Sequence, residues 1–334
     1  MMVKIAFFDI KSYDRDFFAK ENKKYNFDFQ FIENRLSERS VKFIEDGTEV
    51  VCLFTNDIVD EKIVDHLVKK GVKLIALRCA GYNNINLDAV RGKISVVRVP
   101  EYSPYAVAEH TFALLLDLNR GISRAGRRTR EFDFRLHGLL GFDLNGKTVG
   151  VIGVGKIGKV FIKIAKGFGM NVIAYDKVQS EDLERGLGFK YVDDMDEIFT
   201  KSDVISLHCP LLPSTRHIIN EASIDKMKNS AVILNTSRGA LINTKDMLDA
   251  LLSEKIAGAA LDVYEEEADY FFEDCSDSNF LKDPILAQML GMHNVLVTSH
   301  QAFFTKEALN NISETTLANV KSFVDGKKLV NEVK

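Results

Sequence analysis

A glycine-rich turn near the middle of the chain constrains the fold more than any other feature of the sequence. The turn runs from Gly153 to Gly158 and matches the pattern G-x-G-x-x-G. The apolar run Thr148–Ile152 precedes it and predicts a strand, while Lys156–Phe168 follows with the spacing of an amphipathic helix. A strand, this turn and a helix in that order are typical of a dinucleotide-binding α/β sheet. A glycine-rich turn without a ligand is the alternative, and the flanking strand and helix argue against it.

The residues of the turn have separate roles in such a site. Gly153 allows the tight bend, Gly155 lets a pyrophosphate approach the backbone, and Gly158 lets the helix pack closely on the strand. Lys156 and Ile157 begin the helix, whose free N–H groups and partial positive charge attract phosphate. All five positions are therefore expected to contact the cofactor.

An acidic residue after the next predicted strand indicates which dinucleotide binds. The strand Asn171–Tyr175 is followed by Asp176, eighteen residues after Gly158. A carboxylate at this position accepts hydrogen bonds from both ribose hydroxyls. Its charge would also repel a 2′-phosphate. We therefore expect NAD rather than NADP as the cofactor, although Lys177 directly follows and weakens this argument.

Short apolar runs alternate with helical segments in two series along the chain. The first series contains helical spacing at Asp14–Lys23, Ser37–Glu45 and Glu61–Lys69, and predicted strands at Lys4–Phe8, Phe27–Ile32, Glu49–Phe54, Lys73–Leu77 and Ser95–Val99. The second series contains six predicted strands, at Thr148–Ile152, Asn171–Tyr175, Asp203–Leu207, Ala231–Asn235, Gly258–Asp262 and Asn294–Thr298. Such alternation predicts parallel sheets covered by helices. We therefore expect an α/β protein with two doubly wound parallel-sheet domains.

The segments that join the two series predict how the domains are connected. A long apolar helix, Tyr105–Arg120, and an arginine-rich stretch lie between the series. The predicted helix Thr305–Val324 lies beyond the last strand, so we expect it to return to the first sheet. This layout predicts a discontinuous, flavodoxin-like substrate domain, residues 1–101 and 300–334. A Rossmann NAD-binding domain, residues 102–299, would be inserted into it.

The composition argues against several classes of function. Hydrophobic residues make up 46% of the chain and charged residues 28%, which are ordinary globular proportions. The formal net charge is −4 with both signs interspersed, unlike the basic stripe of a nucleic-acid-binding protein. The sequence shows no secretory leader and no apolar run of the roughly 20 residues that span a bilayer. We expect a cytoplasmic protein without nucleic-acid or membrane partners.

The cysteines and other potential ligands do not form a metal motif. The four cysteines, Cys52, Cys79, Cys209 and Cys275, include no CxxC pair. No set of histidines, cysteines and carboxylates has the spacing of metal ligands. We therefore expect chemistry without a metal.

Three segments with reactive side chains follow predicted strands of the second series. They contain Arg238, a run of glutamates from Glu265 to Glu267, and His300. Carboxyl ends of parallel strands meet at one sheet edge, where ligands bind. Arginine binds a carboxylate with a planar fork of donors, and histidine exchanges protons near neutral pH. A carboxylate beside the histidine would favour the imidazolium. The set suits reduction of a 2-keto acid.

Each of these residues alone has an ordinary explanation. Arg238 could be a solvated arginine, the glutamates an acidic loop, and His300 a structural histidine. Their joint occurrence after the glycine-rich turn favours the functional interpretation. Two further histidines are assigned differently: we expect His110 to be a packed residue of the apolar helix, and His208 to line the cofactor site.

Several segments together resemble the D-2-hydroxyacid dehydrogenase family, and within it the NAD-dependent D-lactate branch. The resemblance covers nearly the whole chain. The segments that carry it are Leu77–Asn84, Val99–Pro104, Ala108–His110, Val151–Gly158, Asn235–Ala240 and Ser299–Phe303.

The resemblance implies roles for individual residues. Arg238 would bind the substrate carboxylate, His300 would be the general acid and base, and Glu267 would be the partner of His300. We chose Glu267 among the three glutamates because it stands five residues after Asp262. Further residues are expected to bind the substrate (Cys79, Ala80, Gly81, Tyr102 and Phe303) or the cofactor (Val107, His208, Pro210, Thr236, Ser237 and Asp262).

The resemblance also implies a reaction and an assembly. The reaction would be reversible NADH-dependent reduction of pyruvate to D-lactate, because Phe303 would leave room for a short side chain. The alternatives are a 2-hydroxyisocaproate or phenyllactate type of dehydrogenase, and a non-catalytic NADH-sensing regulator. Residues 102–135 would form a homodimer or homotetramer interface.

Overall fold

The computed structural model describes residues 2–278 and 281–334, and the chain divides into two compact units. The first unit contains the residues up to Ser103 together with Phe303–Lys334. The second unit is the continuous segment Pro104–Ala302. The N-terminal and C-terminal parts therefore fold together, with the second unit inserted between them. We expected the boundaries after residues 101 and 299; both lie slightly later in the chain.

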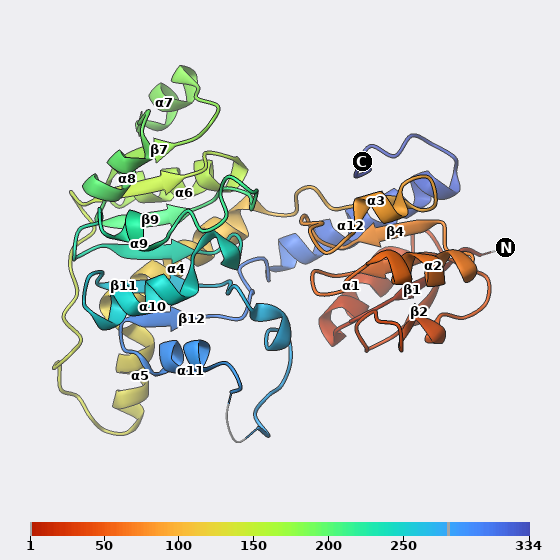
Figure 1. Cartoon of the computed structure of the whole chain (residues 1–334), viewed down its shortest axis with the longest axis horizontal. Helices are drawn as coiled ribbons and strands as arrows, with labels where there is room; N and C mark the ends of the chain where they lie inside the picture. Colours follow the sequence, from red (N-terminus) through yellow and green to blue (C-terminus); the bar gives the residue numbers. More distant parts are fainter. Residues whose placement is uncertain (1, 279–280) are drawn as a thin grey trace. The chain divides into compact units, whose positions relative to one another are not determined.

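The first unit is a parallel five-stranded sheet in the order β2-β1-β3-β4-β5 (Figure 1). Its strands are β1 Lys4–Phe7, β2 Asp28–Phe31, β3 Thr48–Leu53, β4 Leu74–Leu77 and β5 Ser95–Val97. Its α-helices are α1 Ser12–Asn22, α2 Glu61–Lys69, α3 Leu87–Val90 and α12 Lys306–Val324. Helix α12 packs against α1 and β4, so the C-terminal helix returns to this sheet as expected. The strand order is that of a flavodoxin-like fold.

The second unit is a parallel sheet in the order β12-β11-β10-β9-β6-β7-β8. Its strands are β6 Thr148–Ile152, β7 Asn171–Tyr175, β8 Lys190–Tyr191, β9 Val204–Leu207, β10 Val232–Asn235, β11 Gly258–Leu261 and β12 Val295–Val297. Its α-helices are α4 Pro104–Arg120, α5 Ile122–Arg130, α6 Lys156–Gly167, α7 Glu181–Leu187, α8 Met195–Lys201, α9 Glu221–Ile224, α10 Thr244–Leu252 and α11 Pro284–Gly291. The chain runs from β6 outward to β7 and β8 on one side, and then returns through α8 to β9 on the other side of β6. This reversal creates the switch point where ligands bind.

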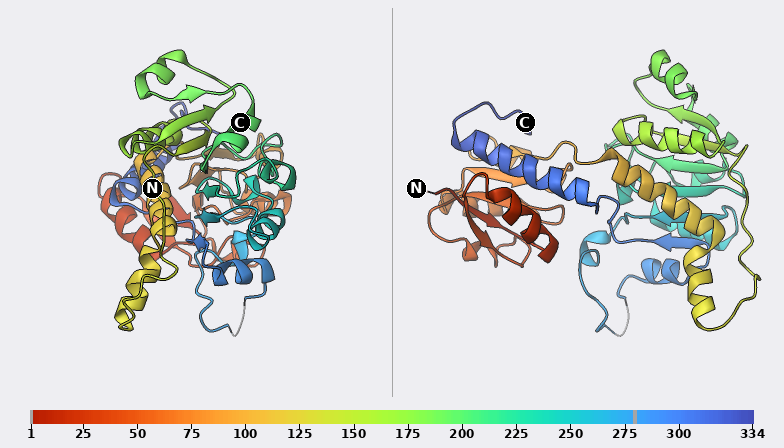
Figure 2. Two further views of the ribbon diagram at one scale, coloured as in Figure 1. Left: turned by 90° about the vertical axis from the view of Figure 1, so that its left-hand side faces the viewer. Right: turned by 180° about the vertical axis from the view of Figure 1, so that it is seen from behind.

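Both faces of the second sheet are buried, because successive strand residues point into different cores. Ile233 belongs to one hydrophobic cluster and its neighbour Leu234 to the other. Helices α4 and α6 cover the face of Leu234, as the reverse view in Figure 2 shows. Helices α8, α9, α10 and α11 supply side chains to the opposite core. This burial explains why these strands are nearly continuous apolar runs.

Two sequence-based expectations about elements were wrong. The helical spacing at Ser37–Glu45 corresponds only to a short 3-10 turn, Val41–Phe43. Ser37 and Ser40 bond each other's backbone and hydroxyl groups, which competes with a regular helix. The strand β8 was missed, because its two residues are too few to show a period.

Candidate functional site

The glycine-rich turn has a geometry that only glycine tolerates at two of its positions. Gly153 has φ +100°, and a Cβ there would lie 2.6 Å from the backbone nitrogen of Cys209. A Cβ on Gly158 would lie 2.2 Å from the carbonyl oxygen of Gly153. A Cβ on Gly155, in contrast, would meet no described atom within 4 Å. Gly153 and Gly158 are thus packed against neighbouring backbone, whereas the space beside Gly155 is open, as a pyrophosphate site requires.

The residues around the turn fit a bound dinucleotide. Gly155 precedes α6 and provides no side-chain cap, and Lys156 and Ile157 begin this helix at its N-terminus, where a phosphate is attracted. Asp176 follows β7, and its carboxylate accepts hydrogen bonds from the N–H of Val154 at 2.7 Å and of Val178 at 3.0 Å. This fixes the carboxylate beside the turn, where it can meet a ribose. The fit supports the assignment of these residues to the cofactor.

His208 lies under the turn and is uncharged at neutral pH. Its carbonyl carbon would lie 2.7 Å from a Cβ on Gly153, and its Nε2 hydrogen-bonds with the hydroxyl of Ser206 at 2.8 Å. Burial lowers the pKa of His208 to about 3. The segment after β10 is attached to the segment after β9, because Ser237 Oγ donates to the carbonyl of Cys209 at 2.8 Å. His208 and Ser237 therefore lie at the switch point, and Pro210 follows Cys209 directly.

Two further residues expected near the cofactor are linked to each other through α4. The hydroxyls of Thr236 and Thr111 lie 2.7 Å apart, and Thr111 donates to the carbonyl of Val107 at 2.7 Å. All three residues are buried. Thr236, at the end of β10, is thereby attached to α4 and held in one orientation.

The structure joins His300 to one of the three candidate glutamates. His300 Nδ1 lies 2.7 Å from Glu267 Oε1, and the other oxygen, Glu267 Oε2, accepts from the N–H of Tyr264 at 2.9 Å. The side chains of His300 and Glu267 are only 16% and 18% exposed. Because Nδ1 faces Glu267, Nε2 remains as the nitrogen that can face a substrate. The choice of Glu267 as the partner of His300 thus agrees with the geometry.

Asp262 holds the loop that carries His300. Its carboxylate accepts from Thr298 Oγ1 at 2.6 Å and from the N–H groups of Gln301 and Ala302 at 2.9 and 2.8 Å, while its carbonyl accepts from the N–H of His300 at 2.7 Å. Burial would raise the pKa of Asp262, but these hydrogen bonds and one from His110 hold it below the usual value. His300 has φ +53°, and this network stabilises that left-handed backbone. A contact between Asp262 and the nicotinamide stays a prediction.

His110 has a polar role that the sequence did not reveal. We expected a packed residue, but its Nε2 lies 3.3 Å from Asp262 Oδ1 and 3.2 Å from Thr298 Oγ1. The apolar pattern of α4 concealed this contact, since His110 and Asp262 are far apart in the sequence. The only available signal was a histidine on an otherwise apolar helix face.

Arg238 presents a guanidinium without a carboxylate partner among the described residues. Nη1 donates to the carbonyl of Ser237 at 2.6 Å, and the side chain is half-buried. The loop is fixed behind it, because a Cβ on Gly239 would lie 2.1 Å from the carbonyl carbon of Tyr264. Arg238, Glu267 and His300 all belong to the second unit. An open cation and a histidine–carboxylate pair can together bind and protonate a small keto acid.

In the first unit, the turn after β4 has free N–H groups. The carbonyls of Cys79, Ala80 and Gly81 accept from Val99 N, Arg98 Nη1 and Cys79 Sγ, respectively. Within the described residues, the N–H groups of Ala80 and Gly81 donate to no acceptor. Two adjacent free N–H groups are suited to an anion. The turn expected to bind a carboxylate therefore has the required donors.

The two aromatic residues expected near the substrate contact each other in the first unit. The rings of Tyr102 and Phe303 lie 6.2 Å apart with an edge-to-face geometry, and Phe54 lies 6.0 Å from Phe303. Phe303 is buried, and the amide of Asn311 donates to the carbonyl of Tyr102 at 2.5 Å. These contacts fix the orientation of the Phe303 ring.

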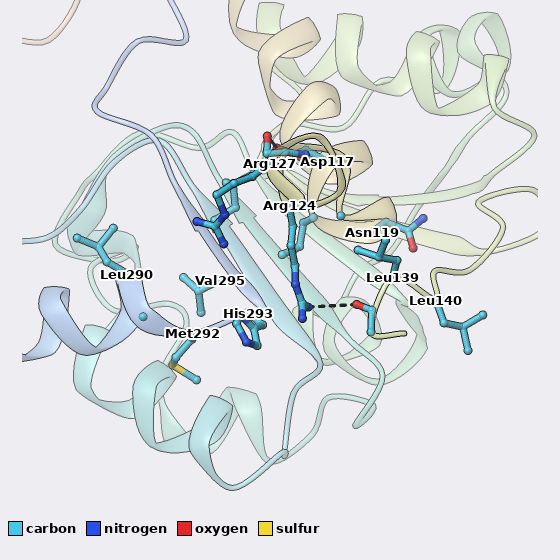
Figure 3. A pocket seen from close by; sticks show the side chains of 16 residues that line it. Asp117, Asn119, Arg124, Arg127, Leu139, Leu140, Leu290, Met292, His293 and Val295 are labelled. Atoms are coloured by element: carbon cyan, nitrogen blue, oxygen red, sulfur yellow. Dashed lines mark hydrogen bonds between the residues drawn. The ribbon is translucent and has the colours of Figure 1, made fainter. Parts of the chain in front are cut away.

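A separate cavity of about 420 Å³ in the second unit contains none of the predicted site residues. Figure 3 shows Arg124 and Arg127 from α5 pointing toward His293, which precedes β12. The cavity lies at the start of β12, whereas His300 follows the end of that strand. It is therefore distinct from the cluster around His300. No helix in the described part of the chain is long and apolar enough to cross a membrane.

Comparison with known proteins identifies the family. Residues 112–302 match the family model "D-isomer specific 2-hydroxyacid dehydrogenase, NAD binding domain". The chain belongs to this family. A 2-hydroxyacid dehydrogenase homolog of Haemophilus influenzae is 49% identical over 332 residues, covering 99% of both chains. D-lactate dehydrogenase of Escherichia coli is 46% identical over 332 residues, covering 99% of this chain and 100% of the relative.

Solved structures agree with this assignment. The structure of the pyruvate reductase of Chlamydomonas reinhardtii matches with a TM-score of 0.91 at 41% identity, covering 99% of this chain and 98% of the other. The protein is therefore an NAD-dependent oxidoreductase of the D-2-hydroxyacid dehydrogenase family, and its fold is the family's pair of parallel-sheet units. The expectation that the cofactor is NAD is confirmed by the family model, whereas the contact of the glycine-rich turn with NAD stays a prediction.

Proposed function

We propose that the protein reduces pyruvate to D-lactate reversibly, with His300 as the general acid and base. The observation that carries this proposal is the 2.7 Å contact between His300 Nδ1 and Glu267 Oε1 in the same unit as Arg238. Because His300 Nδ1 faces Glu267, the other ring nitrogen, Nε2, is the one that can exchange a proton with the substrate. The guanidinium of Arg238 is available to bind the substrate carboxylate. The names of the E. coli and C. reinhardtii relatives support D-lactate and pyruvate as the substrate pair.

In the proposed reduction, Arg238 binds the keto-acid carboxylate and orients the carbonyl group. NADH held by the glycine-rich turn Gly153–Gly158 and by Asp176 would supply the hydride. His300 Nε2 donates its proton to the carbonyl oxygen, and Glu267 stabilises the imidazolium before this transfer. In the reverse direction His300 accepts the hydroxyl proton. The N–H groups of Ala80 and Gly81 are the proposed further donors to the carboxylate, and Tyr102 is a further proposed substrate contact.

Phe303 is the proposed determinant of side-chain size. It is buried against Phe54 and Tyr102, so a large ring is held in place in the first unit. We propose that this ring favours the methyl group of pyruvate over the benzyl group of phenylpyruvate. We also propose that six residues of the second unit contact NAD: Val107, His208, Pro210, Thr236, Ser237 and Asp262.

The direct test is to follow NADH absorbance with pyruvate and then identify the product enantiomer with stereospecific assays. NADH oxidation with formation of D-lactate is the expected result. Turnover of phenylpyruvate or 2-ketoisocaproate with a kcat/KM equal to that of pyruvate would contradict the role of Phe303. Tight NADH binding without turnover of any keto acid would contradict the catalytic proposal.

We further propose a homodimer or homotetramer that uses residues 102–135. In this region Phe132 and Phe134 are 83% and 70% exposed, and Ile122 on α5 is also exposed. Exposed aromatic residues that are close together in sequence support an interface with a second copy. Light scattering should give a mass of two or four chains, and a Phe132→Ser, Phe134→Ser variant should reduce it. A monomeric mass for the native chain would contradict this proposal.

A further inference from the structure

Glu265 belongs to a partly buried polar cluster beside the proposed catalytic residues. Its Oε1 accepts from His217 Nε2 at 2.7 Å and from Arg216 Nη2 at 3.0 Å, and its Oε2 lies 3.4 Å from Thr244 Oγ1. The side chain of Glu265 is 16% exposed, and that of His217 is 31% exposed. Glu266, between Glu265 and Glu267, is exposed instead. The three adjacent glutamates therefore have three different environments.

The partner His217 connects this cluster to the loop that carries Arg238. The backbone N–H of His217 donates to the carbonyl of Ala240 at 2.9 Å, two residues after Arg238. A second backbone hydrogen bond, from the N–H of Ile219 to the carbonyl of Leu241 at 3.1 Å, joins the same two segments. His217 therefore binds the Arg238 loop with its backbone and Glu265 with its imidazole.

The Arg238 loop also packs directly on the backbone around Glu265. A Cβ on Gly239 would lie 2.1 Å from the carbonyl carbon of Tyr264 and 2.4 Å from the nitrogen of Glu265. The N–H of Tyr264 donates to Glu267 Oε2 at 2.9 Å. The segment 264–267 thus contacts the Arg238 loop at Gly239 and holds the partner of His300 at Glu267.

We infer that Glu265 is a positioning residue that fixes Arg238 relative to the Glu267–His300 pair. The carboxylate of Glu265 binds the imidazole of His217, and the backbone of His217 binds the loop that carries Arg238. Glu265 thereby connects the Arg238 loop to the segment that carries Glu267. Misplacing a reacting group by about 1 Å can cost about 10²-fold in rate, so this distance matters for the reaction. The inference rests on the proposed function, because it assigns a role relative to Arg238 and His300.

The test compares Glu265→Ala and His217→Ala with Glu266→Ala, whose side chain is exposed. We would measure kcat and KM for pyruvate, the Kd of NADH, the Tm, and the Kd of oxamate, an isoelectronic analogue of pyruvate, in the presence of NADH. Glu265→Ala should raise the KM and the oxamate Kd by about tenfold and change the NADH Kd by less than about twofold. His217→Ala should act in the same direction, and the double variant should be little worse than either single variant. Glu266→Ala should match the native enzyme.

A merely structural role gives a different result. If Glu265→Ala lowers the Tm but leaves the pyruvate KM and the oxamate Kd unchanged, the inference is overturned. Should Glu265→Ala fail to fold, Glu265→Met replaces it, since methionine keeps the side-chain length but has no oxygen to accept from His217, and the same rise in oxamate Kd is required. Arg238→Ala distinguishes failure of this inference from failure of the proposed function. If Arg238→Ala weakens oxamate binding and the Glu265 variants do not, this inference alone fails. If Arg238→Ala also leaves oxamate binding unchanged, the proposed function fails as well.

Discussion

Two arginines follow strands of the two parallel sheets, and the protein uses them in opposite ways. Arg78 directly follows β4 and is 1% exposed, and its Nη2 donates to the carbonyl of Asp9 at 2.7 Å. Its Nε lies 3.4 Å from Asp14 Oδ2, and its guanidinium lies 4.8 Å from the centre of the Phe54 ring. Arg238, three residues after β10, is half-buried and has no carboxylate partner among the described residues.

The difference teaches that position after a strand does not decide the role of an arginine. Arg78 is surrounded by buried acids, and burial raises the pKa of Asp57 to about 6 although the charge of Arg78 opposes this. Its charge is therefore balanced inside the protein by these carboxylates. The charge of Arg238 is not balanced in this way and is available to an anion. One arginine is thus structural and the other is the proposed substrate ligand.

The sharpest test of this comparison is Arg238→Ala. Because two charge-assisted hydrogen bonds to the substrate carboxylate would be lost, kcat/KM for pyruvate should fall by about 10³-fold, or about 4 kcal/mol. The Tm should change little. Arg238→Lys should restore only part of the activity, since lysine keeps the charge without the planar fork. Steady-state kinetics and thermal melting measure both effects, with Arg185→Ala on the exposed part of α7 as the control. A native kcat/KM in Arg238→Ala would refute the role.

Arg78→Met should produce the opposite pattern. It would leave Asp14 and Asp57 buried without their cation, so the free energy of unfolding should fall by about 3 kcal/mol. Urea unfolding measures this change. Arg91→Met is the matched control, because the Arg91 side chain is 74% exposed in its pair with Asp88. Equal stabilities of the two variants would show that the buried cluster does not depend on Arg78.

Glu267→Gln should sharpen the catalytic side of the comparison. The amide can still accept a hydrogen bond from His300, but it lacks the charge that favours the imidazolium, so kcat should fall by about 10²-fold. Steady-state kinetics of the native enzyme, Glu267→Gln and the control Glu266→Gln measure this fall. A native kcat in Glu267→Gln would remove Glu267 from the acid–base pair.

The smallest expected effect concerns His208, which contrasts with His300 as a half-buried, neutral histidine directly after β9. Its folded pKa of about 3 lies below the ordinary value of 6.5, so below pH 6.5 the unfolded chain binds a proton that the folded chain does not. Stability should therefore fall as the pH decreases from 6.5 toward 3. In His208→Asn the fall between pH 7 and 5.5 should be smaller by up to about 1 kcal/mol. Urea unfolding at these two pH values, with His66→Asn as the control, tests the difference. Parallel pH curves would contradict it.

Much of the fold could be predicted from the sequence, because its signals are local. The strand Thr148–Ile152, the strand Asn171–Tyr175 and the helix Glu61–Lys69 have the predicted bounds in the structure. Periodicity and glycine placement depend on neighbouring residues, so they can be recognised in one chain. The same reasoning failed at residues 37–45, where local serine hydrogen bonds outweigh the helical pattern, and at β8, which is too short to show one.

The residue types of the site were also determined by the sequence: an arginine, a carboxylate and a histidine after strands of one sheet. The resemblance predicted Glu267 as the partner of His300, but only the tertiary structure determines the surroundings of all three adjacent glutamates. One binds His300, one binds His217 and one is exposed. His110 contacts Asp262, although the two residues are far apart in the sequence. Arg78 is buried, whereas Arg238 is only half-buried. Residue type and local period are properties of a short segment, whereas burial and charge pairing depend on distant segments that meet only when the chain folds.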